Sequence, residues 1–125
     1  MGLTNAYRNY LAQATIGESV TPFDSSNAYI GVGDSTTAFD PTQTDLLGTN
    51  KLRKGMDGGY PVRSTNAMTF QATFSTSEGN FAWNEWGVFN ASASGTILNR
   101  KVEYLGTKTS SQTWQIQVTV TLTVE

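Results

Sequence analysis

Three aspartates between residues 34 and 45 are the first groups in this sequence that could do chemistry. Asp34, Asp40 and Asp45 lie close enough along the chain to gather around a hard cation, which prefers carboxylate oxygens. They lack the dense alternate spacing of a calcium-binding loop, and short acidic side chains also cap turns. We therefore expect turn capping, and we predict no metal site and no cofactor.

Three basic residues follow within a glycine-rich stretch, residues 49–61. Lys51, Arg53 and Lys54 could bind a phosphate or an acidic partner. The stretch has little periodicity, which predicts an exposed, flexible loop between ordered elements. We expect its cations to face solvent, with a protein partner as the alternative.

Two glycines at the end of an apolar run resemble part of a dinucleotide-binding fingerprint. Gly31 and Gly33 have the right spacing, but residue 36 is Thr where the third glycine belongs. No strand–helix–strand pattern follows them. We expect these glycines to permit a tight turn out of a strand.

The densest aromatic segment is residues 83–89, which read Trp-Asn-Glu-Trp-Gly-Val-Phe. Exposed Trp is common at interfaces and on carbohydrate-binding platforms. Strand alternation places Trp83 and Glu85 on one face and Trp86 on the other, so both faces are partly apolar. We favour core packing, with an intersubunit contact as the alternative. Glu85, between two tryptophans, needs a cation such as Arg100 or Arg63.

The composition argues against most enzyme classes. The chain has no His and no Cys, which removes the commonest general base and the thiolate nucleophile. A net charge of −2 with 14% charged residues lacks the basic footprint of a nucleic-acid-binding protein. No apolar run approaches the roughly 20 residues that span a bilayer. We expect a non-enzymatic chain without nucleic-acid or membrane partners.

A helix is predicted at the start of the chain, over residues 1–15. Its apolar positions recur every three or four residues, and Thr4 or Asn5 is placed to cap it. Gly17 is expected to end it. An apolar run at residues 28–32 predicts a strand, and Asp40 followed by Pro41 predicts a short loop helix that closes at Gly48.

From Val62 onward the sequence reads as strands joined by short turns. The clearest strand is residues 114–124, where apolar residues alternate with an outward row that includes Gln115, Gln117 and Thr119. Short turns favour antiparallel neighbours. The sequence therefore predicts one mainly β domain over residues 1–125, an antiparallel β-sandwich or Greek-key sheet with one N-terminal helix and the short loop helix.

Two segments resemble a known family. Residues 29–48 contain Tyr-Ile-Gly-Val-Gly-Asp-Ser-Thr-Thr-Ala and a later Asp-Leu-Leu-Gly, and residues 85–100 contain Glu-Trp-Gly-Val-Phe-Asn and Gly-Thr-Ile-Leu-Asn-Arg. Together, in this order and spacing, they resemble conserved blocks of tailed-bacteriophage virion proteins, namely small tail fibre proteins and the base-proximal domains of tail-collar fibres. The resemblance implies a non-catalytic structural role in the virion, after synthesis in the bacterial cytoplasm. A fibre shaft and a receptor-binding tip are not expected.

The favoured hypothesis is a tail fibre, baseplate or adaptor subunit that contacts other phage virion proteins, as a homo-oligomer or in many copies. A capsid decoration protein is the first alternative. The second is a carbohydrate-binding module for host glycans built on Trp83, Trp86 or Trp114. The residues predicted to form protein interfaces are Tyr7, Tyr10, Leu11, Lys51, Arg53, Lys54, Trp83, Trp86, Gln115, Gln117 and Thr119.

Overall fold

The computed structural model describes residues 2–123, which form one helix and seven strands. The elements in chain order are α1 (Asn5–Thr15), β1 (Tyr29–Gly33), β2 (Lys51–Gly55), β3 (Val62–Ser64), β4 (Ala67–Phe74), β5 (Ala82–Phe89), β6 (Ile97–Thr107) and β7 (Trp114–Thr121). The mainly β prediction is confirmed. Val124, expected to extend the last strand, lies outside the described residues.

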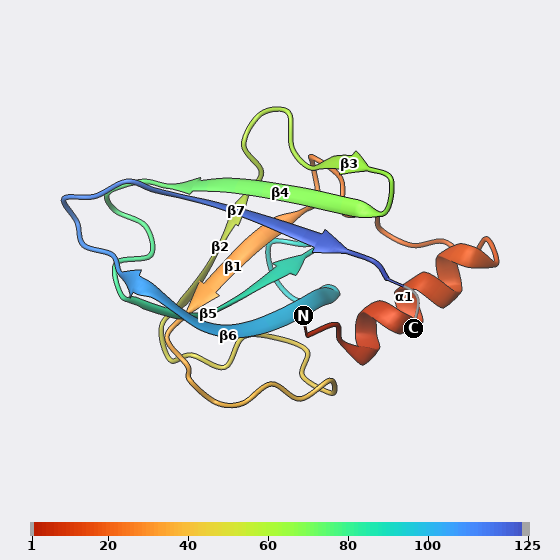
Figure 1. Cartoon of the computed structure of the whole chain (residues 1–125), viewed down its shortest axis with the longest axis horizontal. Coiled ribbons are helices and arrows are strands. Elements are labelled where there is room, and N and C mark those ends of the chain that lie inside the picture. Colours follow the sequence, from red (N-terminus) through yellow and green to blue (C-terminus); the bar gives the residue numbers. More distant parts are fainter. Residues whose placement is uncertain (1, 124–125) are drawn as a thin grey trace.

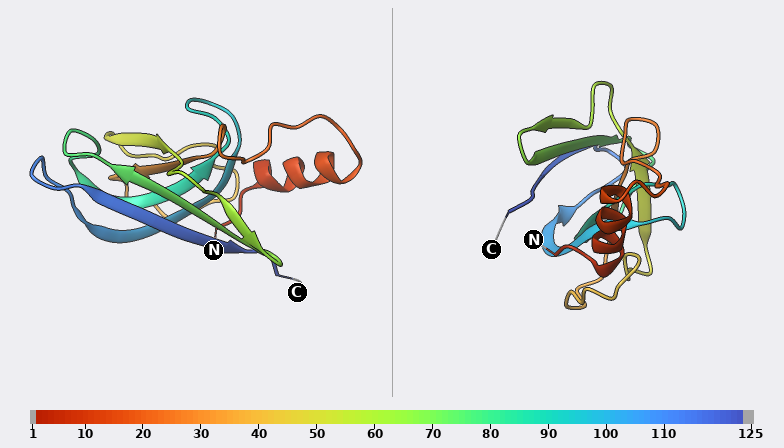
Figure 2. Two further views of the ribbon diagram at one scale, coloured as in Figure 1. Left: turned by 90° about the horizontal axis from the view of Figure 1, so that it is seen from above. Right: turned by 90° about the vertical axis from the view of Figure 1, so that its right-hand side faces the viewer.

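The strands form two antiparallel sheets, with the orders β2-β1-β5-β6 and β3-β4-β7. Figure 2 shows them as two layers. Their inner faces share one apolar cluster, to which β1 contributes Ile30 and Val32 and β4 contributes Phe70 and Phe74. The sheets thus pack face to face in a sandwich-like arrangement, because each strand buries alternate side chains.

Helix α1 lies at one end of the two layers (Figure 1). The Thr4 hydroxyl accepts a hydrogen bond from the Tyr7 amide at 3.0 Å and donates to the Ile97 carbonyl at 2.6 Å. Thr4 therefore caps the helix, as expected, and also ties it to β6. Gly17, with φ of +85°, follows the last turn. The buried Tyr7 ring meets the Phe23 ring edge-on at 5.7 Å, which joins the helix to the core.

Two sequence-based predictions are wrong. Residues 40–48 form a single turn at Asp40 and no helix, because the amides of Leu47 and Gly48 donate to a carboxylate from β5 instead of to helical carbonyls. The predicted flexible loop at 49–61 contains β2, which pairs with β1 along its whole length. A strand supported by a neighbouring strand needs no periodicity of its own, which is why the sequence pattern missed it.

The prediction for the faces of residues 83–89 is also corrected. The pairing of β5 with β6 shifts between Trp83 and Glu85, which marks a β-bulge. The extra residue changes the alternation, so Trp83 joins Trp86 in the main core and Glu85 faces the opposite side of the sheet. Trp83 donates from its indole nitrogen to the Gly79 carbonyl at 2.8 Å and packs on Phe74. Core packing of both tryptophans, the favoured interpretation, is confirmed.

Candidate functional site

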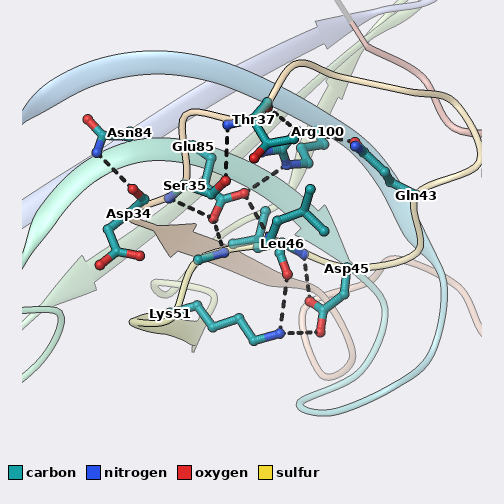
Figure 3. Close-up of polar contacts among 12 residues, drawn as sticks. Asp34, Ser35, Thr37, Gln43, Asp45, Leu46, Lys51, Asn84, Glu85 and Arg100 are labelled. Atoms are coloured by element: carbon teal, nitrogen blue, oxygen red, sulfur yellow. Dashed lines mark hydrogen bonds and ion pairs between the residues drawn. The ribbon is translucent and has the colours of Figure 1, made fainter.

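Glu85 is completely buried, and both oxygens of its carboxylate accept hydrogen bonds. Its Oε1 accepts from Arg100 Nε at 2.7 Å and from the Leu47 amide at 3.0 Å. Its Oε2 accepts from the Gly48 amide at 2.7 Å and from the Ser35 amide at 3.3 Å (Figure 3). Charge-assisted bonds from several donors offset the cost of burying a carboxylate. The expected cationic partner, Arg100, is confirmed.

Arg100 reaches Glu85 from the neighbouring strand β6 and is also completely buried. Its Nη1 donates to the Thr37 carbonyl at 2.9 Å and to Gln43 Oε1 at 3.2 Å. Its Nη2 is buried and makes no hydrogen bond to a described residue. The guanidinium therefore links the carboxylate on the sheet to two points of the loop that follows β1.

Residues 34–50, which we call the clamped loop, connect β1 to β2 and are held at both ends and in the middle. Asp34 closes its base, because its carboxylate accepts from the Asn50 side chain at 2.8 Å and from the Asn50 amide at 3.2 Å. The hydrogen bond from the Asn50 side chain lowers the pKa of Asp34. Asn84 on β5 donates to the Asp34 carbonyl at 2.9 Å. The loop thus has a fixed path without regular secondary structure.

The glycines of β1 make room for this arrangement. Gly33 lies opposite Glu85 in the sheet register, and a Cβ there would collide with the Glu85 carboxylate. A Cβ at Gly31 would lie 2.7 Å from the Phe89 ring. Neither glycine has a positive φ, so the predicted tight turn is wrong. The glycines are needed for close packing against β5, not for backbone freedom.

The predicted turn-capping role is confirmed for Asp40 but not for Asp34, whose carboxylate joins the two ends of the clamped loop. Asp40 accepts from the Thr42 amide at 2.9 Å, and Asp45 accepts from the Leu46 amide at 2.8 Å. Burial of Asp45 acts to raise its pKa. The net pKa is nevertheless lowered, mainly because Lys51 donates a hydrogen bond to the carboxylate. Within residues 2–123, no three acidic side chains come together in a way that could hold a metal ion.

The basic residues of β2 make contacts within the fold, and the expectation that they face solvent is wrong for Arg53, whose side chain is only 12% exposed. Arg53 lies over the Phe89 ring at 3.6 Å and donates to the carbonyls of Ala91 and Ser94, each at 2.9 Å. Lys54 forms an ion pair with Glu78 at 2.8 Å. Lys51 is exposed but pairs with Asp45 at 2.8 Å.

The residues predicted to form interfaces do not gather in one place. Tyr7, Trp83 and Trp86 are buried inside the chain, which corrects their assignment to an interface. The side chains of Tyr10, Leu11, Arg53 and Lys54 are partly buried. The exposed members are Lys51 and the outward row of β7, namely Gln115, Gln117 and Thr119.

Sequence reasoning found the ion pair but missed the loop that it holds. The contacts come from the amides of Ser35, Leu47 and Gly48 and from the Thr37 carbonyl. Backbone groups carry no residue-type signal, so only the folded arrangement reveals them. No helix among residues 2–123 is long and apolar enough to cross a membrane. Comparisons with protein-family models, with curated proteins and with solved structures find no match for this chain.

Proposed function

We propose that this chain is a structural subunit of a tailed-bacteriophage particle, in the tail as a fibre, baseplate or adaptor protein, which binds neighbouring virion proteins without catalysing a reaction. The observation that supports the proposal is that Glu85 and Arg100 hold the clamped loop in place. Both are completely buried, and their bonds go to each other and to the clamped loop. A pair placed in this way cannot reach a substrate, and its effect is to fix a surface.

The clamped loop is the surface that this pair prepares for binding. Connecting loops of this length without regular structure usually serve a function. A loop that is already fixed loses little conformational entropy when a partner binds, which favours affinity. Leu47 lies on this loop with 45% of its surface exposed, although its amide is held by Glu85. An apolar side chain on a rigid, polar loop is suited to act as an anchor in a protein interface.

The resemblance of residues 29–48 and 85–100 to tail fibre proteins agrees with this placement. The two segments contain residues 34–48 of the clamped loop, Glu85 and Arg100, so the resemblance and the site largely coincide. The carbohydrate-binding alternative is weakened, because Trp83 and Trp86 are at most 4% exposed and offer no platform. Trp114, the third candidate, is half-buried and its ring packs against Trp83 at 5.0 Å. A capsid decoration protein would use the same kind of binding surface. The position of the chain on the particle distinguishes this alternative from a tail protein.

The position is tested by cryo-electron microscopy of particles from cells that produce this protein. Density for the chain at the tail tip, collar or fibre base is the expected result. A regular array over the capsid shell would contradict the tail assignment and establish a decoration protein. Absence of the chain from purified particles would contradict a virion role altogether.

The binding surface is tested with two matched variants. Leu47→Glu places a charge on the clamped loop, whereas Val62→Glu places the same charge at an equally apolar position on β3 that is 49% exposed. We expect Leu47→Glu to lower incorporation into particles by at least tenfold, while Val62→Glu is incorporated as the wild type is. Circular dichroism of both purified variants controls for folding. Equal incorporation of the two variants would remove the clamped loop from the interface.

A further inference from the structure

Strand β7 forms an open edge of the second sheet. It is the last strand in the order β3-β4-β7 and pairs with β4 from Phe74↔Trp114 to Ala67↔Thr121. Within residues 2–123, β4 is the only strand that pairs with β7. An edge strand of eight residues presents a row of backbone donors and acceptors that can pair with another chain.

The outward backbone groups of β7 can be assigned from the register. Leu122 donates its amide to the Asn66 carbonyl at 2.9 Å, so the even-numbered residues direct their backbone groups toward β4. The odd-numbered residues then direct theirs outward. Close side-chain pairs between Thr69 and Thr119 at 3.0 Å, and between Gln71 and Gln117 at 2.8 Å, agree with this, because side chains approach most closely at pairs that share no backbone bonds.

The four edge strands differ in how they are protected. Edge strand β2 carries Lys51, Arg53 and Lys54, and β3 has only three residues, including Arg63. Edge strand β6 carries Lys101 and Glu103, and Leu3 bridges to its first half. Strand β7 contains no charged residue and no proline from Trp114 to Thr121. Charges and prolines are the usual means of preventing unwanted strand pairing, so β7 is the edge that is left able to pair.

The inner side chains of β7 are less well covered than those of its neighbour. Ile116 and Val118 are 7% and 8% exposed, whereas Phe70 and Ala72, which lie opposite them on β4, are 1% and 0% exposed. Leu105 on the edge strand of the other sheet is 42% exposed. Leu105, Trp114 and Ile116 line one surface cavity together. The open edge is therefore bordered by apolar surface on its core side.

We propose that β7 pairs antiparallel with β7 of a second copy of this chain, so that the two three-stranded sheets become one continuous sheet. The sequence of the strand is complementary to itself. In the register that places Gln117 opposite Thr119 of the second copy, polar residues meet polar residues and apolar residues meet apolar residues. The outward backbone groups of the odd-numbered residues then bond across the two-fold axis. A neutral strand meets its copy without charge repulsion, and this two-fold contact closes as a dimer.

This inference does not depend on the proposed virion function, because self-association is measured on the purified chain. Sedimentation velocity over a concentration series is expected to show wild-type chain shifting from one-chain to two-chain mass. The variant Gln117→Lys with Thr119→Lys puts like charges opposite each other across the axis. It should raise the dimer dissociation constant at least a hundredfold. The variant Gln117→Glu with Thr119→Glu should behave in the same way.

Mixing the Lys variant with the Glu variant is expected to restore a dimer, because opposite charges then meet across the same register. Asn9→Lys with Gln13→Lys, at exposed positions of α1, adds the same charge away from β7 and should dimerise as the wild type does. A wild-type chain that stays monomeric over the whole series would overturn the proposal. So would a Lys variant that dimerises as strongly as the wild type.

Hydrogen exchange tests the proposal on the wild-type chain alone, without any substitution. The amides of Gln115, Gln117 and Thr119 should become protected as the concentration rises, while the amides of the β2 edge keep constant exchange rates. Exchange at these three amides that does not change with concentration would contradict β7 pairing, even if the chain associates through another surface.

Discussion

Gly33 and Glu85 face each other across β1 and β5, and the Glu85 carboxylate occupies the space that any side chain at position 33 would need. The carboxylate is thereby directed toward the amides of Ser35 and Gly48, at the two ends of the clamped loop. The missing side chain on one strand thus decides where a buried charge on the next strand can lie. The path of the loop follows from that position.

Gly33→Ala should therefore destabilise the protein by about 3 kcal/mol, because the new methyl group displaces a buried carboxylate from its donors. Gly55→Ala is the matched control on β2, where a Cβ would meet the Tyr29 ring at an ordinary 3.6 Å. We expect it to change stability by less than about 1 kcal/mol. Urea unfolding measures both variants, and equal losses would refute the close-packing role of Gly33.

Removing either member of the buried ion pair should strongly destabilise the protein, because the other member stays buried without its partner. Glu85→Gln and Arg100→Met each leave an uncompensated buried partner, with an expected loss of about 3–5 kcal/mol. The double variant should lose clearly less than the sum of the two single losses. Urea unfolding of the four proteins gives the coupling free energy. Additive losses would show that the two side chains act independently.

Acid should weaken the link between β2 and the turn after β4. Hydrogen bonds from Lys54 and from the Ser75 amide lower the pKa of Glu78 from 4.5 to about 2. Between these pH values unfolded chains bind a proton at Glu78 that folded chains do not. The contribution of Glu78 to the free energy of unfolding is therefore fully present above pH 4.5 and is lost as the pH falls toward 2. Glu78→Gln should flatten this part of the profile of unfolding free energy against pH. The same slope in both proteins would contradict the assignment.

Arg53→Lys should destabilise the protein by about 1–2 kcal/mol although the charge is kept. An ammonium group cannot lie flat on the Phe89 ring while it donates to the carbonyls of Ala91 and Ser94. Arg8→Lys, at an exposed position of α1, is the control and should be neutral within about 0.5 kcal/mol. Thermal unfolding compares them. A neutral Arg53→Lys would show that charge alone matters at this position.

Several features could be read from the sequence because they depend on local patterns. Alternation identified β7 and its outward Gln and Thr row, and three- and four-residue spacing identified α1. Of the two candidate caps, Thr4 and Asn5, the structure selects Thr4. The need of Glu85 for a cation was also visible, since a carboxylate between two tryptophans on a strand requires one. Each of these follows from the residue itself and its immediate neighbours along the chain.

Other features were decided only by the tertiary structure. Strand β2 has no strand pattern of its own and forms because β1 supplies its hydrogen bonds. The bulge between Trp83 and Glu85 places Trp83 on the face of Trp86 instead of the predicted face of Glu85, because pairing with β6 sets the register. The clamped loop depends on backbone amides far from Glu85 in sequence, and its glycines serve close packing between strands. Local patterns specify which faces are apolar, whereas contacts between distant backbone groups carry no residue-type signal and exist only in the folded chain.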